Sequence, residues 1–215
     1  MTIRLRNLSD LYPLISAHAP GYNETSAIRE LRRSLQDLCQ YAAVSQDTVE
    51  SSLAIGERTL FYDSPHPSHL VVHRVLSITT PTGQILPKAL DEMNEVHGWR
   101  TADGTPKWAC PESPGELSLY PSAPTAVISP IYIRLALSPK STTTKIDEDV
   151  MDRYSNIIAD GALSRILRIG GQKWSNPGES ADCQRRFTTA CSNARAVGNK
   201  TNARTVMRLP IRRQC

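Results

Sequence analysis

Two groups of residues in this chain carry side chains that could do chemistry, and the first is a set of histidines. His66, His69 and His73 form the densest histidine group. On a strand, His69 and His73 would share a face but would stand roughly 13 Å apart along it. That separation is too large for one metal ion, so we interpret them as solvated histidines on a strand face.

The second group is acidic and consists of Asp147, Glu148, Asp149 and Asp152. Four carboxylates this close in sequence could bind a divalent cation. The group also lies where a helix is expected to begin, and acidic side chains in a first helical turn interact favourably with the helix dipole. We favour the helical interpretation, and we expect no metal site and no cofactor.

Other catalytic signatures are missing from the sequence. The motifs GxGxxG, GxxxxGK[ST], HExxH and GxSxG do not occur. A Ser/His/Asp triad has no residue context that favours it. We therefore expect a protein that is not an enzyme.

The cysteines and tryptophans favour structural roles. Five cysteines, an odd number at wide spacing, fit neither a disulfide framework nor the CxxC spacing of a zinc site. Cys39, Cys183 and Cys191 occupy apolar positions of helical patterns, so we expect them to be buried as small hydrophobic residues. The tryptophans are expected to anchor a core or an interface rather than to stack on nucleic-acid bases; they are Trp99, Trp108 and Trp174.

The distribution of charge is the feature that most favours a function. The net charge is +4, but residues 183–215 contain eight basic residues and no acidic one, which leaves 17 basic and 21 acidic residues in 1–182. An acidic body with a basic tail predicts a negatively charged partner, either nucleic acid or an acidic protein surface. Apolar residues alternate with the arginines of the tail, which favours docking over simple solvation. The predicted docking residues are Arg204, Val206, Met207, Arg208, Leu209, Ile211, Arg212 and Arg213.

Helical periodicity is expected at both ends of the chain. The apolar spacing predicts a short helix from Ser9 to Ala17 with Leu11, Leu14 and Ile15 turned inward. It also predicts a long helix whose apolar stripe runs from Ile28 to Ala42 and which Asn23 or Thr25 can cap. A third helix begins at Asp147 and ends near Gly170, with Gly161 at a close contact. A fourth begins at Asn176-Pro177 and ends at Gly198-Asn199.

The middle of the chain has the patterns of strands. Residues 70–78, 117–120 and 131–137 are apolar or alternate with period two, and prolines and glycines separate them. A short helix from Lys88 to Val96 interrupts them. The expected fold class is α+β, with a helical bundle from the N- and C-terminal helices, a compact antiparallel β-sandwich or barrel-like unit at about 52–137, and an extended C-terminal arm. The expected domains are a helical one (1–50 and 140–199), a β domain (51–139) and a docking arm (200–215).

Several segments resemble one known family. They begin with APG at 19–21 and LQDLC at 35–39, and continue with VLSI at 75–78, GQILP at 83–87, GW at 98–99, GTPKW at 104–108, LSLYP at 117–121 and LALSP at 135–139. The most specific are IADGALSRIL at 158–167, KWSNP at 173–177 and the pair Arg186-Phe187. The chain is similar in these segments to the head-to-tail adaptor (connector) proteins of podovirus-type bacteriophages, the tail tubular protein A-like family. It departs from the family at Gln46 and Asp47, where a tryptophan is common.

The resemblance implies a structural virion protein without catalytic residues. Such an adaptor forms a ring of twelve copies beneath the portal and connects the capsid to the tail around the DNA channel. The implied partners are the portal protein, a tail nozzle or tail tube protein and further copies of the chain, while genomic DNA passes through without sequence-specific binding. The implied location is the neck of the virion, after assembly in the host cytoplasm and with no membrane partner.

Two other function classes remain open. The basic tail could grip phosphates in a nucleic-acid-binding protein, which strongly salt-dependent binding by the monomer would support. A hydrolase of an unrecognised family could use the β region, which a converging polar cluster in a pocket would support.

Overall fold

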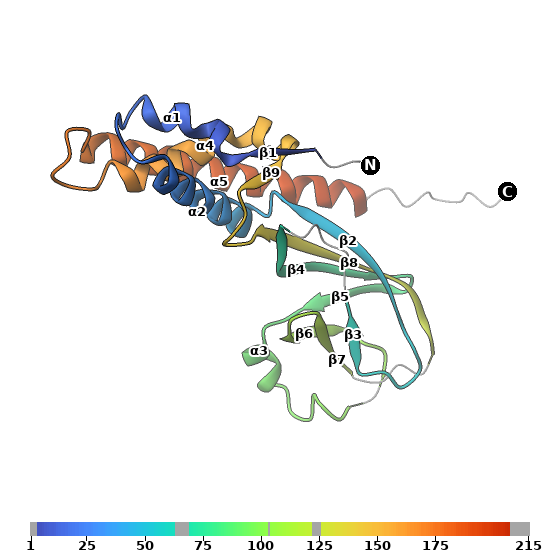
Figure 1. Ribbon diagram of the computed structural model, residues 1–215. Coiled ribbons are helices and arrows are strands. Elements are labelled where there is room, and N and C mark those ends of the chain that lie inside the picture. Colours follow the sequence, from blue (N-terminus) through green and yellow to red (C-terminus); the bar gives the residue numbers. More distant parts are fainter. Residues whose placement is uncertain (1–3, 63–68, 103, 122–125, 207–215) are drawn as a thin grey trace. The chain divides into compact units, whose positions relative to one another are not determined.

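The computed structural model describes residues 4–62, 69–102, 104–121 and 126–206, and the side chains as far as Ala196. The chain forms two compact units (Figure 1). The helical unit comprises residues 1–45 and 138–215, and the β unit comprises residues 46–137. The fold class is α+β, as predicted. Within the described residues, no helix has the length and apolar character needed to span a membrane.

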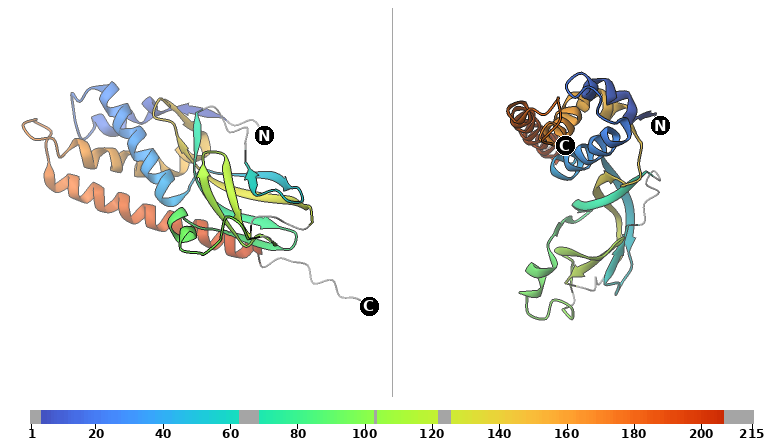
Figure 2. Two further views of the ribbon diagram at one scale, coloured as in Figure 1. Left: turned by 90° about the horizontal axis from the view of Figure 1, so that it is seen from below. Right: turned by 60° about the vertical axis from the view of Figure 1, so that its left-hand side comes forward.

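The helical unit is built from segments at both ends of the chain. Figure 2 shows α1, α2, α4 and α5 around a shared interior. Two short strands, β1 and β9, pair in antiparallel fashion beside them. The elements of this unit are β1 (Leu5–Asn7), the 3-10 helix η1 (Leu8–Leu11), α1 (Tyr12–Ser16), α2 (Glu24–Ala42), β9 (Lys145–Asp147), α4 (Glu148–Ile166) and α5 (Pro177–Val206).

Local sequence signals set the bounds of α2. The side chain of Asn23 accepts a hydrogen bond from the backbone N–H of Ser26 at 3.1 Å, so the predicted cap is confirmed. The helix ends at Ala43, which has a left-handed backbone with φ of 50°. The N-terminal prediction was partly wrong, because Leu14 is 37% exposed. The inward positions of η1 and α1 are Leu8, Leu11 and Ile15, which follow the spacing of three and four residues of one helical face.

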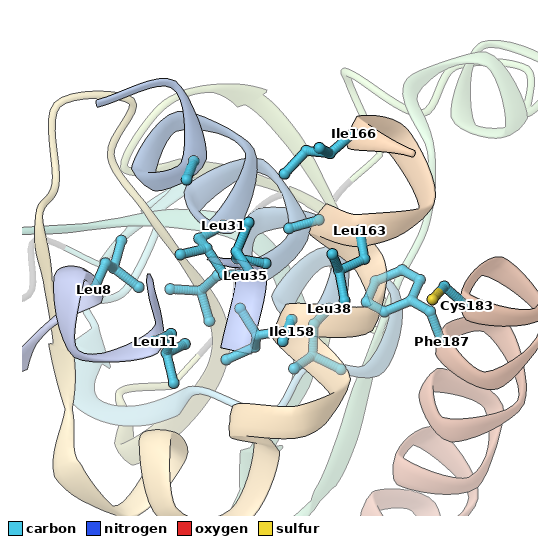
Figure 3. Close-up of a cluster of buried hydrophobic side chains, with 14 of the residues drawn as sticks. Leu8, Leu11, Leu31, Leu35, Leu38, Ile158, Leu163, Ile166, Cys183 and Phe187 are labelled. Atoms are coloured by element: carbon cyan, nitrogen blue, oxygen red, sulfur yellow. The ribbon is translucent and has the colours of Figure 1, made fainter. Parts of the chain in front are cut away.

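One apolar cluster fills the helical unit. Figure 3 shows leucines of α2 facing α4 and α5. Burial of these side chains is the main favourable term that holds the two ends of the chain together. The labelled members are Leu8, Leu11, Leu31, Leu35, Leu38, Ile158, Leu163, Ile166, Cys183 and Phe187.

Gly161 lies where α2, α4 and α5 come closest, as predicted. A Cβ atom at this position would overlap the hydroxyl of Ser34 on α2 and would lie 2.8 Å from two ring carbons of Phe187 on α5. Real Cβ contacts are essentially never that short, so a Cβ here would force the Ser34 and Phe187 side chains to move. The close approach explains why α4 carries a residue that costs about 1 kcal/mol relative to alanine in a helix interior.

We predict that Gly161→Leu destabilises the protein by roughly 1–3 kcal/mol, because the larger side chain overpacks the three-helix contact. The free energy of unfolding from urea denaturation measures the change. Gly170→Leu is the matched control, since a Cβ at Gly170 meets nothing within 4 Å. An unchanged stability for the Gly161 variant would show that the helices are not packed in this way.

The β unit is a nearly closed, barrel-like sheet of seven strands in the order β2-β8-β4-β5-β6-β7-β3. The two edge strands approach each other where the Ser51 hydroxyl donates to the Phe61 carbonyl at 3.0 Å. Its core is a second apolar cluster, separate from that of the helical unit. The elements are β2 (Gln46–Leu53), β3 (Thr59–Phe61), β4 (Leu70–Thr80), β5 (Gly83–Pro87), α3 (Leu90–Asn94), β6 (Trp108–Ser113), β7 (Glu116–Tyr120) and β8 (Ile128–Pro139).

The sheet is mixed, so the prediction of an antiparallel unit was wrong in part. Strands β5 and β6 are parallel, with Leu86 opposite Trp108 and Pro87 opposite Ala109. Parallel neighbours require a crossover of a dozen residues or more. Residues 88–107, which include α3, provide that crossover. The turn predicted at Pro81-Thr82-Gly83 joins β4 to β5, with Thr80 opposite Gly83.

The C-terminal helix is longer than predicted. We expected it to end at Gly198-Asn199, but α5 continues to Val206. A glycine inside a helix costs only about 1 kcal/mol, and the alanine, arginine and lysine residues around it are good helix formers. The predicted arm therefore begins inside a helix, and residues 207–215 lie outside the described part of the chain.

Candidate partner-binding surface on the helical unit

The predicted docking residues fall at and beyond the end of α5. Arg204 and Val206 belong to its last turn, although their side chains lie outside the described part. The other six predicted residues lie outside the described residues altogether: Met207, Arg208, Leu209, Ile211, Arg212 and Arg213. The structure thus gives the base of the predicted arm, and its contacts show how α5 is held.

The beginning of α5 is fixed by a side-chain cap at Asn176 and by a link to α1. The Asn176 side chain accepts from the Glu179 backbone N–H at 3.1 Å, and its amide donates to the Glu179 carboxylate at 3.1 Å. The other Glu179 oxygen lies 2.5 Å from Nδ1 of His18, just after α1. The predicted start signal is confirmed, and α5 is anchored at its first turn.

A bidentate ion pair ties α5 to α4. The Arg186 guanidinium donates to both carboxylate oxygens of Asp160, at 3.0 and 2.6 Å. These hydrogen bonds raise the pKa of Arg186 above its already high value. Nearly two turns earlier, the Ser180 hydroxyl donates to the Ser164 carbonyl at 2.6 Å. The first part of α5 therefore has a defined position on the bundle.

An apolar groove of about 390 Å³ runs between α2 and α5. Its lining residues come from the end of α2 and the middle of α5, and they are Asp37, Gln40, Tyr41, Phe187, Thr188 and Cys191. The Tyr41 side chain is 48% exposed, and the guanidinium of Arg195 lies 5.6 Å from its ring centroid. Sequence reasoning missed this groove because it needs the pairing of α2 with α5, which are about 150 residues apart.

Arginines are concentrated along the same side of α2. Arg29 and Arg33 contact one buried carboxylate, that of Glu30, at 3.3 and 3.1 Å. Arg165 of α4 pairs with Asp37 at the groove. Because two exposed guanidinium groups share one carboxylate, the side of α2 that leads to the groove carries a surplus of positive charge.

The helical cysteines are buried, as predicted. Burial, with a smaller contribution from the negative charge of Asp147, raises the pKa of Cys39 to about 12. Burial and the charge of Asp37 raise the pKa of Cys191 to about 11. Both thiols are therefore protonated at neutral pH, and the reactive thiolate form is scarce.

We predict that the stabilisation provided by the buried Cys39 thiol decreases at alkaline pH. The folded thiol keeps its proton up to about pH 12, whereas the unfolded thiol releases it near its ordinary pKa of about 8.5. The contribution of the protonated Cys39 thiol to the free energy of unfolding is complete below about pH 8.5 and is lost as the pH rises toward 12. The stability deficit of Cys39→Ala, measured by urea denaturation, should therefore shrink between pH 8 and 10.5. The deficit of Leu38→Ala, a cavity control without a titrating group, should stay constant over that range.

The described histidines of the first group and the acidic group lie on separate elements. His69 and His73 lie on β4, and His66 lies outside the described residues. Burial, together with the nearby charge of Arg74, lowers the pKa of His73. Asp147 is the N-cap residue of α4, and Asp152 accepts from Arg6 at 3.1 Å. Among the described residues, no three His, Cys, Asp or Glu side chains form a group that could hold a metal ion.

The tryptophans pack inside the chain, as predicted. Trp99 is buried, and its indole N–H donates to the Asn94 side chain at 3.3 Å. Trp108 stacks on Tyr120 with 5.3 Å between ring centroids. Trp174 meets Tyr22 edge to face at 5.4 Å, which closes the loop between α4 and α5 against the bundle.

Charge divides between the two units. The β unit contains ten acidic and six basic residues, a net charge of −4. The remaining residues contain eleven acidic and nineteen basic ones, a net charge of +8.

Comparison with protein-family models and with curated proteins finds no match to this chain.

Proposed function

We propose that the protein is a head-to-tail adaptor of a short-tailed phage, a structural virion protein that forms a ring beneath the portal and connects the capsid to the tail around the DNA channel. The observation that supports this proposal best is the continuation of a well-anchored helix into a purely basic end. From Cys183 onward the chain has eight basic residues and no acidic one. The resemblance of the segments at 158–167 and 173–177 to adaptor proteins supplies the identity of the partner.

The end of α5 needs a partner because the bundle does not extend with it. Helix α5 has 30 residues and α4 has 19, which correspond to lengths of about 45 and 28 Å. The C-terminal end of α5 runs past α2 and α4 (Figure 1). Its described core contacts are those of Cys183, Phe187, Cys191 and Ala194. Beyond these residues the basic side chains repel one another, and a negatively charged partner would relieve that repulsion.

In the proposed complex, the arm docks on the portal. Its arginines pair with portal carboxylates, and its apolar residues fill grooves between them. Exposed ion pairs alone contribute little, and ordering a flexible arm costs conformational entropy. The apolar residues should therefore matter as much as the arginines. The tail nozzle or tail tube protein would bind on the distal side of the ring, and DNA would pass through the ring without sequence-specific contacts.

A second candidate function is nucleic-acid binding, and the same basic end favours it. Phosphate contacts release counterions, so binding of this kind weakens steeply as the salt concentration rises. Binding to an apolar and acidic protein surface depends less on salt. Titration of the intact protein with double-stranded DNA and with the portal, each at low and high salt, separates the two functions.

Removal of the C-terminal residues tests the docking arm. One variant ends at Asn199 and a second ends at Val206, the last residue of α5. We predict that both keep the thermal stability of the full chain, because the described core lies before residue 199, and that both fail to join the purified portal of the same phage in electron micrographs and sedimentation.

A full-length double variant, Met207→Ser with Leu209→Ser, separates apolar contacts from charge. It should also fail to dock although every arginine remains. Undiminished portal binding by the variant that ends at Asn199 would show that the arm is not the docking element, and a DNA-facing role would then be the better explanation.

Ring formation should depend on the portal. The isolated protein is predicted to be mostly monomeric at micromolar concentration, since one arm without a partner gives no gain in local concentration. Sedimentation velocity of the pure protein measures this. A stable closed ring of the pure protein would contradict it.

A further inference from the structure

The groove between α2 and α5 combines an apolar floor with a basic edge. Tyr41, Phe187 and Cys191 form the floor, and the Tyr41 ring is about half exposed. Such a floor gains free energy when an apolar side chain of a partner covers it.

Positive charge flanks this floor on both helices. Arg195 of α5 lies over the Tyr41 ring, where a cation is favourable. Arg33 of α2, whose side chain is 58% exposed, lies one turn before Asp37 on the same helical face. Asp37 itself is engaged by Arg165. The edge therefore favours an occupant that carries both an apolar side chain and carboxylates.

The β unit presents a segment with this composition. In α3, Leu90 is 37% exposed, and Asp91, Glu92 and Glu95 beside it are exposed as well. Met93, three residues after Leu90 and on the neighbouring side of α3, is fully buried together with Trp99 and Cys110, so this short helix is held on the β unit with Leu90 at the rim of the contact and the carboxylates facing outward. An exposed leucine among three carboxylates complements a groove with an apolar floor and arginines at its edge.

We propose that the groove between α2 and α5 receives α3 from a second copy of the chain, with Leu90 on the floor and Asp91 and Glu95 opposite Arg33 and Arg195. This inference rests on the proposed function, because it names the contact between neighbours in the ring. The opposite net charges of the two units, −4 and +8, favour the same pairing. The two surfaces differ, so the contact is head-to-tail, and contacts of this kind repeat and can close into a ring.

Disulfide trapping between two full-length proteins tests the contact. Both carry Cys215→Ser; one carries Gln40→Cys at the groove and the other Ala89→Cys at the N-cap of α3, which leaves Leu90 and the carboxylates in place. The native cysteines at 39, 110 and 183 are buried and do not compete, whereas Cys191 lines the groove, so both proteins also carry Cys191→Ala. After mild oxidation of the mixture, a cross-linked heterodimer should form several-fold more than when Tyr132→Cys, an exposed site on β8, replaces Ala89→Cys.

Charge reversal then tests whether the groove recognises the carboxylates of α3. Arg195→Glu on the groove partner should lower the cross-linked yield several-fold, and Glu95→Arg on the α3 partner should restore it. A yield no higher than that of the Tyr132→Cys control overturns the inference. If the chain nevertheless assembles on the portal, the proposed function stands and only the groove assignment fails. If Arg195→Glu abolishes portal binding while no cross-link forms, the groove receives the portal instead, and the inference is likewise overturned.

Discussion

The close approach of three helices at Gly161 is the constraint on which the helical unit depends. The missing side chain lets Ser34 of α2 and Phe187 of α5 reach the same point on α4. Because α2 comes from the N-terminal region and α5 from the C-terminal one, this contact joins the two ends of the chain across the inserted β unit. Phe187 at this contact and Arg186 on Asp160 both lie on the side of α5 that meets α4, and together they fix the rotation of α5.

Fixing α5 in this way determines what the protein presents to its surroundings. With Phe187 turned toward Gly161, Arg186 reaches Asp160 on α4, and Thr188 and Cys191 face α2. The groove and the basic end of the helix are therefore properties of one rigid element. Loss of the Gly161 contact would disturb both together, whereas removal of residues after Val206 would affect the end of the helix alone.

The sequence predicted those elements whose signals are local. The Asn23 and Asn176 caps and the turn at Pro81-Thr82-Gly83 each depend on a few neighbouring residues with a clear physical role. A glycine inside a helical pattern was itself the local signal for the close contact at Gly161, although its partners are distant in the sequence. Burial of Cys39, Cys183 and Cys191 followed from helical periodicity in the same way.

The features that escaped prediction depend on partners distant in the sequence. Strand β2 has a polar sequence in which Val49 and Leu53 are the apolar residues, and only its pairing with β8, where Val49 lies opposite Ile133, identifies it as a strand. Pro111 lies in β6 beside a register shift, where a strand tolerates proline. The groove between α2 and α5 was missed for the same reason, because neither helix alone has a concave surface.

Docking of the arm on the portal and binding of α3 in the groove both involve α5, but the two contacts differ in strength. This difference bears on the order of assembly. A groove filled by one leucine and a few carboxylates is a small interface, well below the area of a stable protein–protein contact, and would be weak between free copies. Docking of the arms on a portal would hold neighbouring copies at high effective concentration, and a weak head-to-tail contact then suffices to close the ring. Strong self-association would instead let rings or open filaments form in the absence of the portal. A groove that is small, partly polar and flanked by like charges is therefore consistent with a subunit that stays apart until its basic helix has found a partner.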